Sequence, residues 1–254
     1  MIAVALGALV LGGYVFWALI SLMAVLMMRE WAGMMKAPRW KTALAVGLVL
    51  AMQAYALLFV NSRYLAAYHD PLVAQAVDLT GSAAILLAVV TFSARLGAGM
   101  LYVVLPAMAI IFLRQQENGI ALTLWMLVIV WATDIGAYFA GRAIGGPKLA
   151  PKISPNKTWA GLVGGMLAAL VIGLAIAWST GLPHMLWLLG APLAVAAQAG
   201  DLFESWLKRI SGVKDSGRIL PGHGGVLDRL DGVVPVAILV AAGVAMKGAL
   251  HGAA

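Results

Sequence analysis

Long runs of apolar residues alternate with short polar segments along most of the chain. Each run continues for about twenty residues, the length that a helix needs to cross a bilayer, and does not alternate as a membrane β-strand would. We therefore expect an all-α, polytopic integral membrane protein with about eight transmembrane helices, seven and nine being the alternatives. The expected spans are Ile2–Met28, Thr42–Val60, Val77–Phe92, Gly97–Leu113, Ile120–Ala140, Trp159–Trp178, Met185–Ala199 and Val233–Met246.

Two of these spans are irregular. Ile2–Met28 is long enough to tilt or break, and it is too long and lacks the basic leader for a signal peptide, so we read it as a retained helix. Met185–Ala199 is short for a full crossing.

Positive charge is divided unequally between the loops. If the N-terminus lies outside and the spans alternate, every Lys and Arg except Arg63, Arg114 and Lys247 falls in an inner loop. Cytoplasmic loops of membrane proteins carry such an excess. The sequence therefore predicts that the polar segments near residues 142–157 and 200–232, and with them the active site, lie on the cytoplasmic side.

Composition excludes other classes of protein. The chain is 63% hydrophobic and only 11% charged, whereas soluble domains are roughly 25% charged. It has no cysteine, which excludes disulfides, thiolate ligands and a thiol nucleophile. The net charge of +7 is spread over short loops, so we expect no nucleic-acid partner.

A dense polar island occupies Gly200–Gly232. It holds five of the ten acidic and five of the seventeen basic residues. Placing ionisable groups beside a bilayer costs free energy, so such a concentration of charge indicates a functional site. Helical spacing places four of its side chains on one face: Asp201, Glu204, Ser205 and Lys208. An amphipathic helix lying at the interface is the alternative, but it does not explain the residues that follow.

Those following residues combine glycines with carboxylates. The glycines of Pro221–Gly225 let backbone N–H groups approach an anion closely. Asp228 and Asp231 are one helical turn apart, and together with Asp201 they supply the hard oxygen ligands that suit Mg²⁺. His223 has no second histidine nearby, so zinc is not indicated.

A second polar cluster lies upstream, between residues 134 and 158. Asp134 lies near the inner end of the fifth span, where an acid needs a metal, water or a partner; a structural pair with Arg142 or another cation is the alternative. The run Ser154–Thr158 supplies hydroxyls, an amide and a cation, which suit contacts to phosphate.

A third and smaller cluster consists of Arg29, Glu30 and Trp31 near the end of the first span. We interpret it as a topological anchor, with Trp31 in a belt of interfacial tryptophans.

The two larger clusters together resemble the phosphatidate cytidylyltransferases, also called CDP-diacylglycerol synthases. The signature of that family is matched by Ser205, Lys208-Arg209, Lys214-Asp215, Pro221-Gly222-His223-Gly224-Gly225 and Asp228-Arg229-Leu230-Asp231. Gly200–Glu204, Asp134–Tyr138 and Ser154–Trp159 match as well, so the resemblance covers roughly residues 130–235. One position departs from the family pattern, since Ala160 stands where an acidic residue usually follows Thr-Trp; we assign it no metal role.

The resemblance implies that CTP and phosphatidic acid react to give CDP-diacylglycerol and pyrophosphate. It implies Mg²⁺, as two ions, held by Asp201, Asp228 and Asp231, with Lys208 as a further catalytic residue. A monovalent cation is compatible with such a site, although no residue demands one. The implied substrate-binding residues are Ser154, Asn156, Lys157, Thr158, Ser205, Arg209, Lys214, Asp215, His223, Gly224, Gly225, Arg229 and Asp134.

The same resemblance suggests how the chain is organised. Residues 1–115 would form N-terminal transmembrane helices without a recognised motif, and residues 116–254 the catalytic region. It also favours a homodimer in a bacterial inner membrane, with the lipid bilayer as its other partner.

Two other functions stay open at this point. A CTP-dependent polyisoprenol kinase would share the phosphate and metal handling but transfer the γ-phosphoryl group. An ion-coupled transporter is the third reading, although the polar motifs lie only in the second half and no inverted repeat is visible. The CDP-alcohol phosphotransferases are disfavoured, because their Asp-Gly-x-x-Ala-Arg opening is missing.

Overall fold

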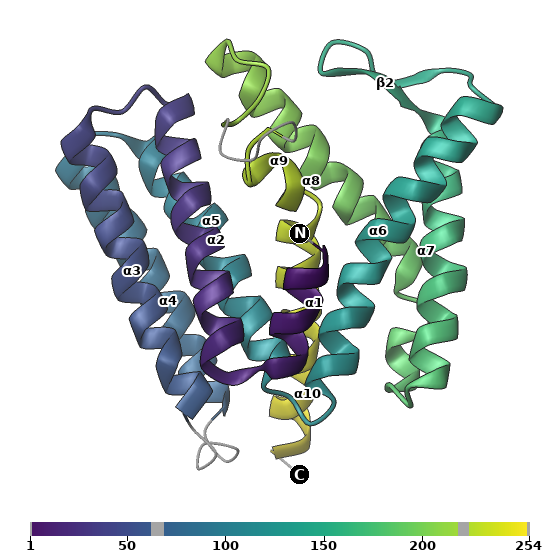
Figure 1. Ribbon diagram of the computed structural model, residues 1–254, viewed down its shortest axis with the longest axis horizontal. Helices are drawn as coiled ribbons and strands as arrows, with labels where there is room; N and C mark the ends of the chain where they lie inside the picture. Colours follow the sequence, from purple (N-terminus) through teal and green to yellow (C-terminus); the bar gives the residue numbers. More distant parts are fainter. Residues whose placement is uncertain (1, 62–68, 218–223, 253–254) are drawn as a thin grey trace. The chain divides into compact units, whose positions relative to one another are not determined.

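Helices make up almost all of the regular structure in the computed structural model, which describes residues 2–61, 69–217 and 224–252 (Figure 1). The chain divides into two units. The first comprises Met1–Glu117, Asp215–Leu227 and Val240–Ala254, and the second comprises Asn118–Lys214 and Asp228–Leu239. The sequence suggested a different division, into a motif-free region (1–115) and a catalytic region (116–254). That division is based on motifs and not on packing, and it stays a prediction.

The first unit is a group of apolar helices. Its long helices pack in the pairs α2 with α3, α4 with α5, and α2 with α5. Buried side chains such as Met28, Leu87 and Met100 fill the space between them. The elements are α1 (Ile2–Leu11), α2 (Gly13–Met34), α3 (Arg39–Asn61), α4 (His69–Thr91) and α5 (Ala94–Arg114).

The expected first span is broken into α1 and α2. Gly12 interrupts the helix with a φ of 65°, a left-handed conformation that favours glycine. A side chain at this position would also run into the guanidinium group of Arg114, which donates a hydrogen bond to the carbonyl of Leu9 (Nε–O 2.8 Å). The long apolar run of the sequence therefore forms two helices rather than one.

Glu30 and Trp31 lie in the interior of the first unit, so the expected place of Trp31 in an interfacial belt is wrong. Glu30 is only 5% exposed and Trp31 only 3% exposed. The indole of Trp31 donates to the carbonyl of Arg95 (Nε1–O 2.8 Å) and stacks near Tyr102. Trp40, by contrast, is exposed, as an interfacial residue would be.

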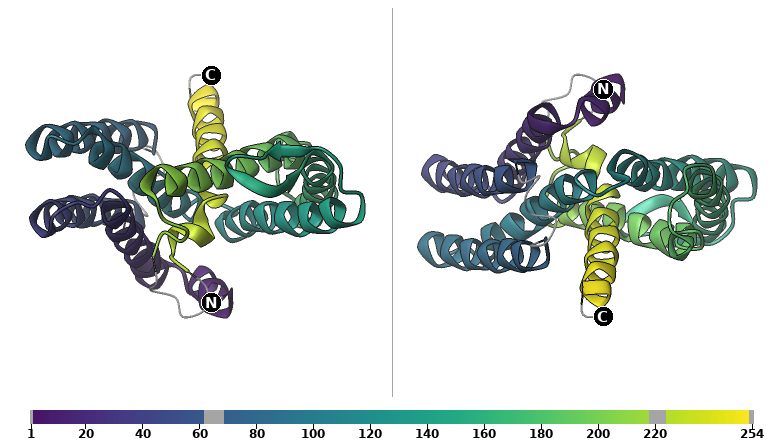
Figure 2. Two further views of the ribbon diagram at one scale, coloured as in Figure 1. Left: turned by 90° about the horizontal axis from the view of Figure 1, so that it is seen from above. Right: turned by 90° about the horizontal axis from the view of Figure 1, so that it is seen from below.

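The second unit is organised around the close pair α6 (Gly119–Ala143) and α7 (Trp159–Ser179), which run side by side in Figures 1 and 2. A side chain added at Gly164 would collide with Ala140, and one added at Gly136 would collide with Ala168. Small residues let transmembrane helices approach closely in this way. Helix α8 (Gly190–Ser211) packs against both, after a short 3₁₀ turn, η1 (His184–Leu186).

A short β-hairpin joins α6 to α7, and the helical content of the rest agrees with the expected all-α class. Strand β1 (Lys148–Ala150) pairs antiparallel with β2 (Ser154–Thr158), and an irregularity in the register lies between Lys148 and Ala150. The hydroxyl of Thr158 then caps α7 by accepting a hydrogen bond from the amide of Gly161 (3.0 Å). The upstream polar motif is therefore a folded hairpin.

Two further helices, α9 (Leu227–Leu230) and α10 (Val233–Gly252), complete the described chain. A left-handed Gly212, with a φ of 72°, ends α8 before the segment that leads to them.

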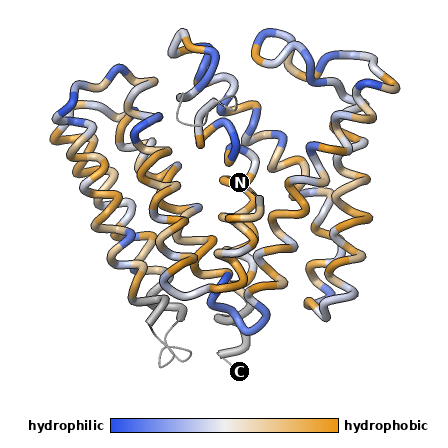
Figure 3. Tube along the Cα trace, viewed as in Figure 1, coloured by the Kyte–Doolittle hydropathy of each residue, from blue (hydrophilic) through white to orange (hydrophobic). Residues whose placement is uncertain are grey.

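Among the described residues, six helices are long and apolar enough to cross a membrane, one for each of the first six expected spans. They lie at Gly13–Met34, Arg39–Leu57, Ala74–Thr91, Ala94–Arg114, Gly119–Ala143 and Trp159–Ser179. Helix α10 contributes a shorter apolar stretch, Val233–Met246, and the polar second half of α8 keeps that helix out of the set. Figure 3 shows the hydrophobic residues along the helices and hydrophilic ones gathered in loops and on α8. The chain has the character of an integral membrane protein.

Candidate active site

Helix α8 carries a polar stripe on one face, as the sequence predicted. The hydroxyl of Ser205 donates to the carboxylate of Asp201 one turn earlier (Oγ–Oδ1 3.3 Å). Lys208 pairs with Glu204 in the same way (Nζ–Oε2 2.6 Å). Residues four apart lie one above the other on a helix, so the stripe follows directly from the sequence spacing.

The upstream motif contacts this stripe through Lys157 of β2. Its ammonium group lies 2.5 Å from a carboxylate oxygen of Asp201 (Nζ–Oδ2) and donates to the side-chain carbonyl of Gln198 (Nζ–Oε1 2.9 Å). Gln198 is buried one turn before Asp201 on α8. Residues from the two clusters that the sequence singled out separately therefore meet within the second unit.

The turn between α9 and α10 approaches α8 at Gly200. A side chain at Gly200 would collide with the backbone carbonyl of Asp231 and with the ring of Pro235. The Asp231 carboxylate accepts a hydrogen bond from the next amide, that of Gly232 (2.7 Å). The glycine that precedes Asp201 thus makes room for a second acidic residue beside it.

Negative charge accumulates where these elements meet. Burial and the charge of Asp201 raise the pKa of Asp231 to about 7, Asp134 of α6 adds to the shift, and the Gly232 amide and Lys157 oppose it. The two neighbouring carboxylates, Asp134 and Asp201, therefore lie close enough to influence the ionisation of Asp231. Arg142, the structural partner considered for Asp134, instead donates to the hydroxyl of Tyr138 (3.1 Å).

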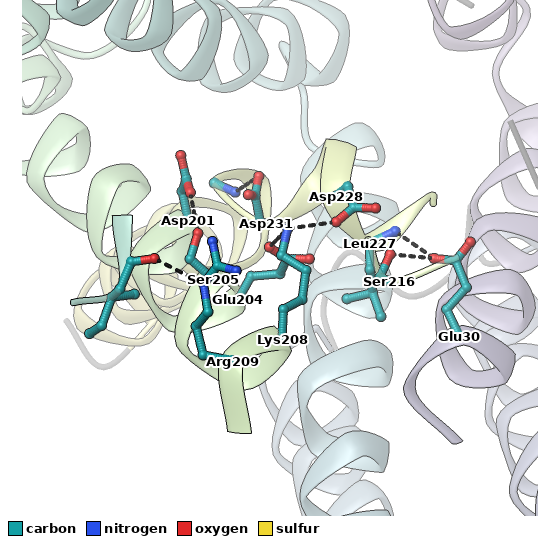
Figure 4. Close-up of polar contacts among 12 residues, drawn as sticks. Glu30, Asp201, Glu204, Ser205, Lys208, Arg209, Ser216, Leu227, Asp228 and Asp231 are labelled. Atoms are coloured by element: carbon teal, nitrogen blue, oxygen red, sulfur yellow. Dashed lines mark hydrogen bonds and ion pairs between the residues drawn. The ribbon is translucent and has the colours of Figure 1, made fainter. Parts of the chain in front are cut away.

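A second charged group forms further along α8, where Lys208 lies between two carboxylates (Figure 4). Its ammonium group is 2.7 Å from Asp228 Oδ1 and 2.6 Å from Glu204 Oε2. Burial alone would lower the pKa of Lys208, but the hydrogen bonds and charges of Asp228 and Glu204 outweigh it and raise that pKa. Lys208 is therefore held in its charged form.

Glu204 also belongs to this group, although the sequence analysis gave it no catalytic, substrate-binding or metal-binding role. Its side chain is 1% exposed, and burial, with a contact to the Asp228 carboxyl group, raises its pKa to about 8 against the opposing effect of Lys208. A strongly perturbed acid beside a cation is typical of functional sites. The signal was present in the sequence, because Glu204 lies on the predicted polar stripe.

The donor set suits a divalent cation only in part. Within the residues that the structure describes, no three acidic or histidine side chains come together as a group that could hold a metal ion. Asp201 and Asp231 nevertheless come from two segments that approach closely, since the backbone of Asp231 lies against Gly200, the residue before Asp201. Mg²⁺ usually takes only one or two protein carboxylates, and water and substrate phosphates complete its shell. This pair of carboxylates therefore fits such an ion.

The hairpin brings other predicted substrate residues toward the end of α8. Arg209 donates to the carbonyl of Ile153 (Nε–O 3.4 Å), directly before Ser154. Ser154 is half-buried and Asn156 is exposed. Thr158, also predicted to bind substrate, is buried and its hydroxyl caps α7.

The remaining predicted residues are not gathered at the α8 stripe by any of the contacts above. Lys214 and Asp215 are exposed after the end of α8, and Arg229 is exposed on α9. Gly224, with a φ of 79°, and the buried Gly225 belong to the first unit. His223 lies outside the described residues.

Comparison with known proteins gives the same family as the motifs. The phosphatidate cytidylyltransferase of Brucella suis biovar 1 is 50% identical over 147 residues, which cover 56% of this chain and 54% of that protein. The protein of that name from Pseudomonas aeruginosa is 45% identical over 159 residues (59% and 58%). The one from Haemophilus influenzae is 44% identical over 128 residues (47% and 44%). This chain thus spans about half the length of the curated relatives it matches.

A family model covers much more of the chain than these alignments. The model described as "Cytidylyltransferase family" matches residues 1–246, which includes both polar clusters and the N-terminal helices. The family expected from the sequence motifs is confirmed: the chain belongs to the cytidylyltransferase family.

Proposed function

We propose that this protein transfers the cytidylyl group of CTP to phosphatidic acid, releasing pyrophosphate. The observation that carries the proposal is the contact between Lys157 and Asp201, which joins the two motif segments into one charged site. The curated relatives named phosphatidate cytidylyltransferase support the choice of substrates. A membrane enzyme is also suited to a lipid substrate that cannot leave the bilayer.

The proposed reaction is a displacement at the α-phosphorus of CTP. An oxygen of the phosphatidic acid phosphate attacks that phosphorus, and a new P–O bond forms. The bond from the α-phosphorus to the α–β bridging oxygen breaks, and pyrophosphate leaves with the electron pair. The lipid phosphate is already ionised at neutral pH, so the site has to orient the reactants and stabilise charge rather than create a nucleophile.

The roles of the charged residues follow from this requirement. Lys157 and Lys208 would contact phosphate oxygens and compensate the charge that moves onto the leaving group. Asp201 and Asp231 would hold a divalent cation, with Asp228 as the third predicted ligand. When bound, Mg²⁺ would supply charge neutralisation on the triphosphate. Asp201 would also hold Lys157 in place, since the two groups form an ion pair.

The other predicted contacts surround these residues. Ser205 and Asp134 lie on the helices that present Asp201 and its neighbours. Further phosphate or nucleotide contacts would come from Ser154, Asn156, Thr158, Arg209, Lys214, Asp215, His223, Gly224, Gly225 and Arg229.

The placement in the membrane is part of the proposal. Eight crossings, with Met185–Ala199 and α10 supplying the last two, would put both motif segments on the cytoplasmic side according to the distribution of basic residues. A bacterial inner membrane is the proposed location, and the relatives named above come from bacteria. Two Mg²⁺ ions and a homodimer are also proposed from the family resemblance.

The test uses the purified chain with phosphatidic acid in detergent micelles and CTP carrying a radioactive label at either the α- or the γ-phosphate. The proposal predicts that the α-label enters the lipid product and the γ-label appears in pyrophosphate. A lipid kinase would instead move the γ-label to an added polyisoprenol. A transporter would leave both labels in CTP, and either result would refute the proposal.

A further inference from the structure

The carboxylate of Glu30, on α2, holds the backbone of a segment nearly two hundred residues later. Its Oε1 accepts a hydrogen bond from the amide of Val226 (2.9 Å), and its Oε2 accepts one from the amide of Leu227 (2.8 Å). The hydroxyl of Ser216 donates to the same Oε2 (3.3 Å). All four residues belong to the first unit, and Figure 4 shows the Glu30 side chain directed at Ser216 and Leu227.

These contacts hold Ser216 before the glycine-rich motif and Val226 and Leu227 after it. Ser216 follows Lys214-Asp215, and Leu227 is bonded directly to Asp228. Two consecutive amides, each donating to its own carboxylate oxygen, fix the two peptide units on either side of the Val226 Cα, just before Asp228. Each of these adjacent peptide units is held by one hydrogen bond, so the backbone is fixed up to the residue before Asp228.

Two glycines, Gly217 and Gly225, lie directly against the Glu30 carboxylate. A Cβ added at Gly217 would lie 2.6 Å from Glu30 Oε1, and one added at Gly225 would lie 2.6 Å from Oε2. No real Cβ tolerates so short a distance unless its neighbour moves. The segment therefore has room for the carboxylate only because these two positions lack side chains.

Burial makes this arrangement costly to alter. Glu30 is 5% exposed, and a buried carboxylate is stable only where donors compensate its lost hydration. The compensating donors here are amides of the segment itself. Each partner would be left with an unsatisfied buried group if the other moved away.

We propose that Glu30 is a positioning residue for the reaction: it sets the backbone that presents Asp228, without touching substrate. This inference rests on the proposed function, in which Asp228 serves the transfer. Helix α2, which carries none of the sequence motifs, would then contribute to the orientation of a predicted site residue.

The first test follows the position of the segment without using activity. The chain contains no cysteine, so Val226→Cys introduces a single thiol at a site that is 2% exposed. We expect a maleimide to label this thiol slowly when Glu30 is present and about tenfold faster after Glu30→Gln, because the NH₂ group of glutamine replaces one accepting oxygen and would face a backbone N–H donor. Glu117→Gln, at an exposed acid of the same unit, is the control and should leave labelling unchanged.

The second test measures turnover. Glu30→Gln should lower kcat for cytidylyl transfer by about tenfold or more and change KM for CTP much less, since the loss falls on the orientation of Asp228 in the transition state. Circular dichroism and gel filtration report how much protein is folded. Rapid labelling of Val226→Cys together with a selective loss of kcat supports the positioning role.

Other outcomes would overturn it. If Glu30 is only a structural residue, Glu30→Gln lowers the melting temperature while labelling and turnover per folded molecule stay as before. If the unaltered chain transfers no cytidylyl group, the proposed function fails, but the labelling result still decides whether Glu30 holds the segment.

A second variant covers the case in which Glu30→Gln cannot be purified. Gly217→Ala pushes against the carboxylate from the other side and should also expose the Val226→Cys thiol. Gly33→Ala, on α2 with no atom near its added Cβ, is the matched control. Equal labelling of the two glycine variants would contradict the positioning role.

Discussion

The ammonium group of Lys157 and the carboxylate of Asp201 form an ion pair of 2.5 Å that joins β2 to α8. Lys157 also bonds to Gln198 on the preceding turn of α8, so its position is fixed by two contacts. The side chain of Lys157 is 17% exposed and that of Asp201 is 32% exposed, which leaves both accessible to a ligand. The contacts therefore fix the positions of Lys157 and Asp201 and leave both side chains partly exposed to substrate.

Removing the cation of this pair should weaken the use of CTP. We predict that Lys157→Met lowers kcat/KM for CTP by about 10- to 100-fold, the range expected for losing a hydrogen bond to a charged group. Steady-state kinetics with purified protein in detergent measure it. The control is Lys148→Met, which removes an exposed lysine from the same hairpin. Similar losses in both variants would mean that Lys157 acts only through the general positive charge of the hairpin.

Removing the cation of the second group should affect stability as well. Lys208→Met leaves Asp228 and the buried Glu204 facing each other without compensation. We predict a loss of about 3 kcal/mol in unfolding free energy, the lower end for a broken buried pair, because Glu204 can take up a proton. Chemical or thermal unfolding in detergent measures the change against Lys152→Met, which removes an exposed lysine.

A double variant separates charge from packing in this group. Lys208→Met combined with Glu204→Gln should recover part of the lost stability, since the uncompensated acid is gone. If the double variant is less stable than Lys208→Met alone, the electrostatic explanation of the group is wrong.

The cap of α7 gives a prediction about folding alone. Thr158→Ala should cost about 1 kcal/mol because the amide of Gly161 loses its acceptor, whereas Thr158→Ser should stay near the unaltered protein. The melting temperature in detergent measures both, with the exposed Thr180→Ala at the other end of α7 as control. Equal stability of the Ala and Ser variants would argue against the cap. If Thr158→Ala also raises KM for CTP, that result would support the phosphate contact predicted for Thr158 from the sequence.

Local features of the site could be predicted from the sequence. The polar stripe of α8 depends only on the helical repeat, and the side chains expected on one face do contact one another there. The break in the first span was likewise allowed by its length, although its position at Gly12 depends on packing against Arg114. The helical repeat is set by backbone geometry, so the side chains that share a helix face can be predicted from their spacing in the sequence.

Contacts between distant segments could not be predicted in the same way. Lys157 and Asp201 were both selected as site residues, but their pairing depends on how the β-hairpin packs against α8. The hairpin itself was missed because its strands are short and rich in polar residues and proline. Such strands carry no alternating apolar pattern to reveal them.

Glu30 shows the same limit most clearly. Its neighbours Arg29 and Trp31 favoured its interpretation as part of a topological anchor, and its partners Val226 and Leu227 are almost two hundred residues away. The one available signal was an acidic residue at the end of an apolar helix, which needs a partner. The sequence did not say which partner that would be.

The central claim is that the α8 stripe carries out cytidylyl transfer, and Asp201 tests it most directly. The measurement is transfer of label from α-labelled CTP to phosphatidic acid by the unaltered chain, by Asp201→Asn and by Asp78→Asn, which removes an exposed acid of α4. We predict label in the lipid for the unaltered chain and for Asp78→Asn, and at least about a hundredfold less for folded Asp201→Asn. Equal transfer by Asp201→Asn, or no transfer by the unaltered chain, would contradict the account.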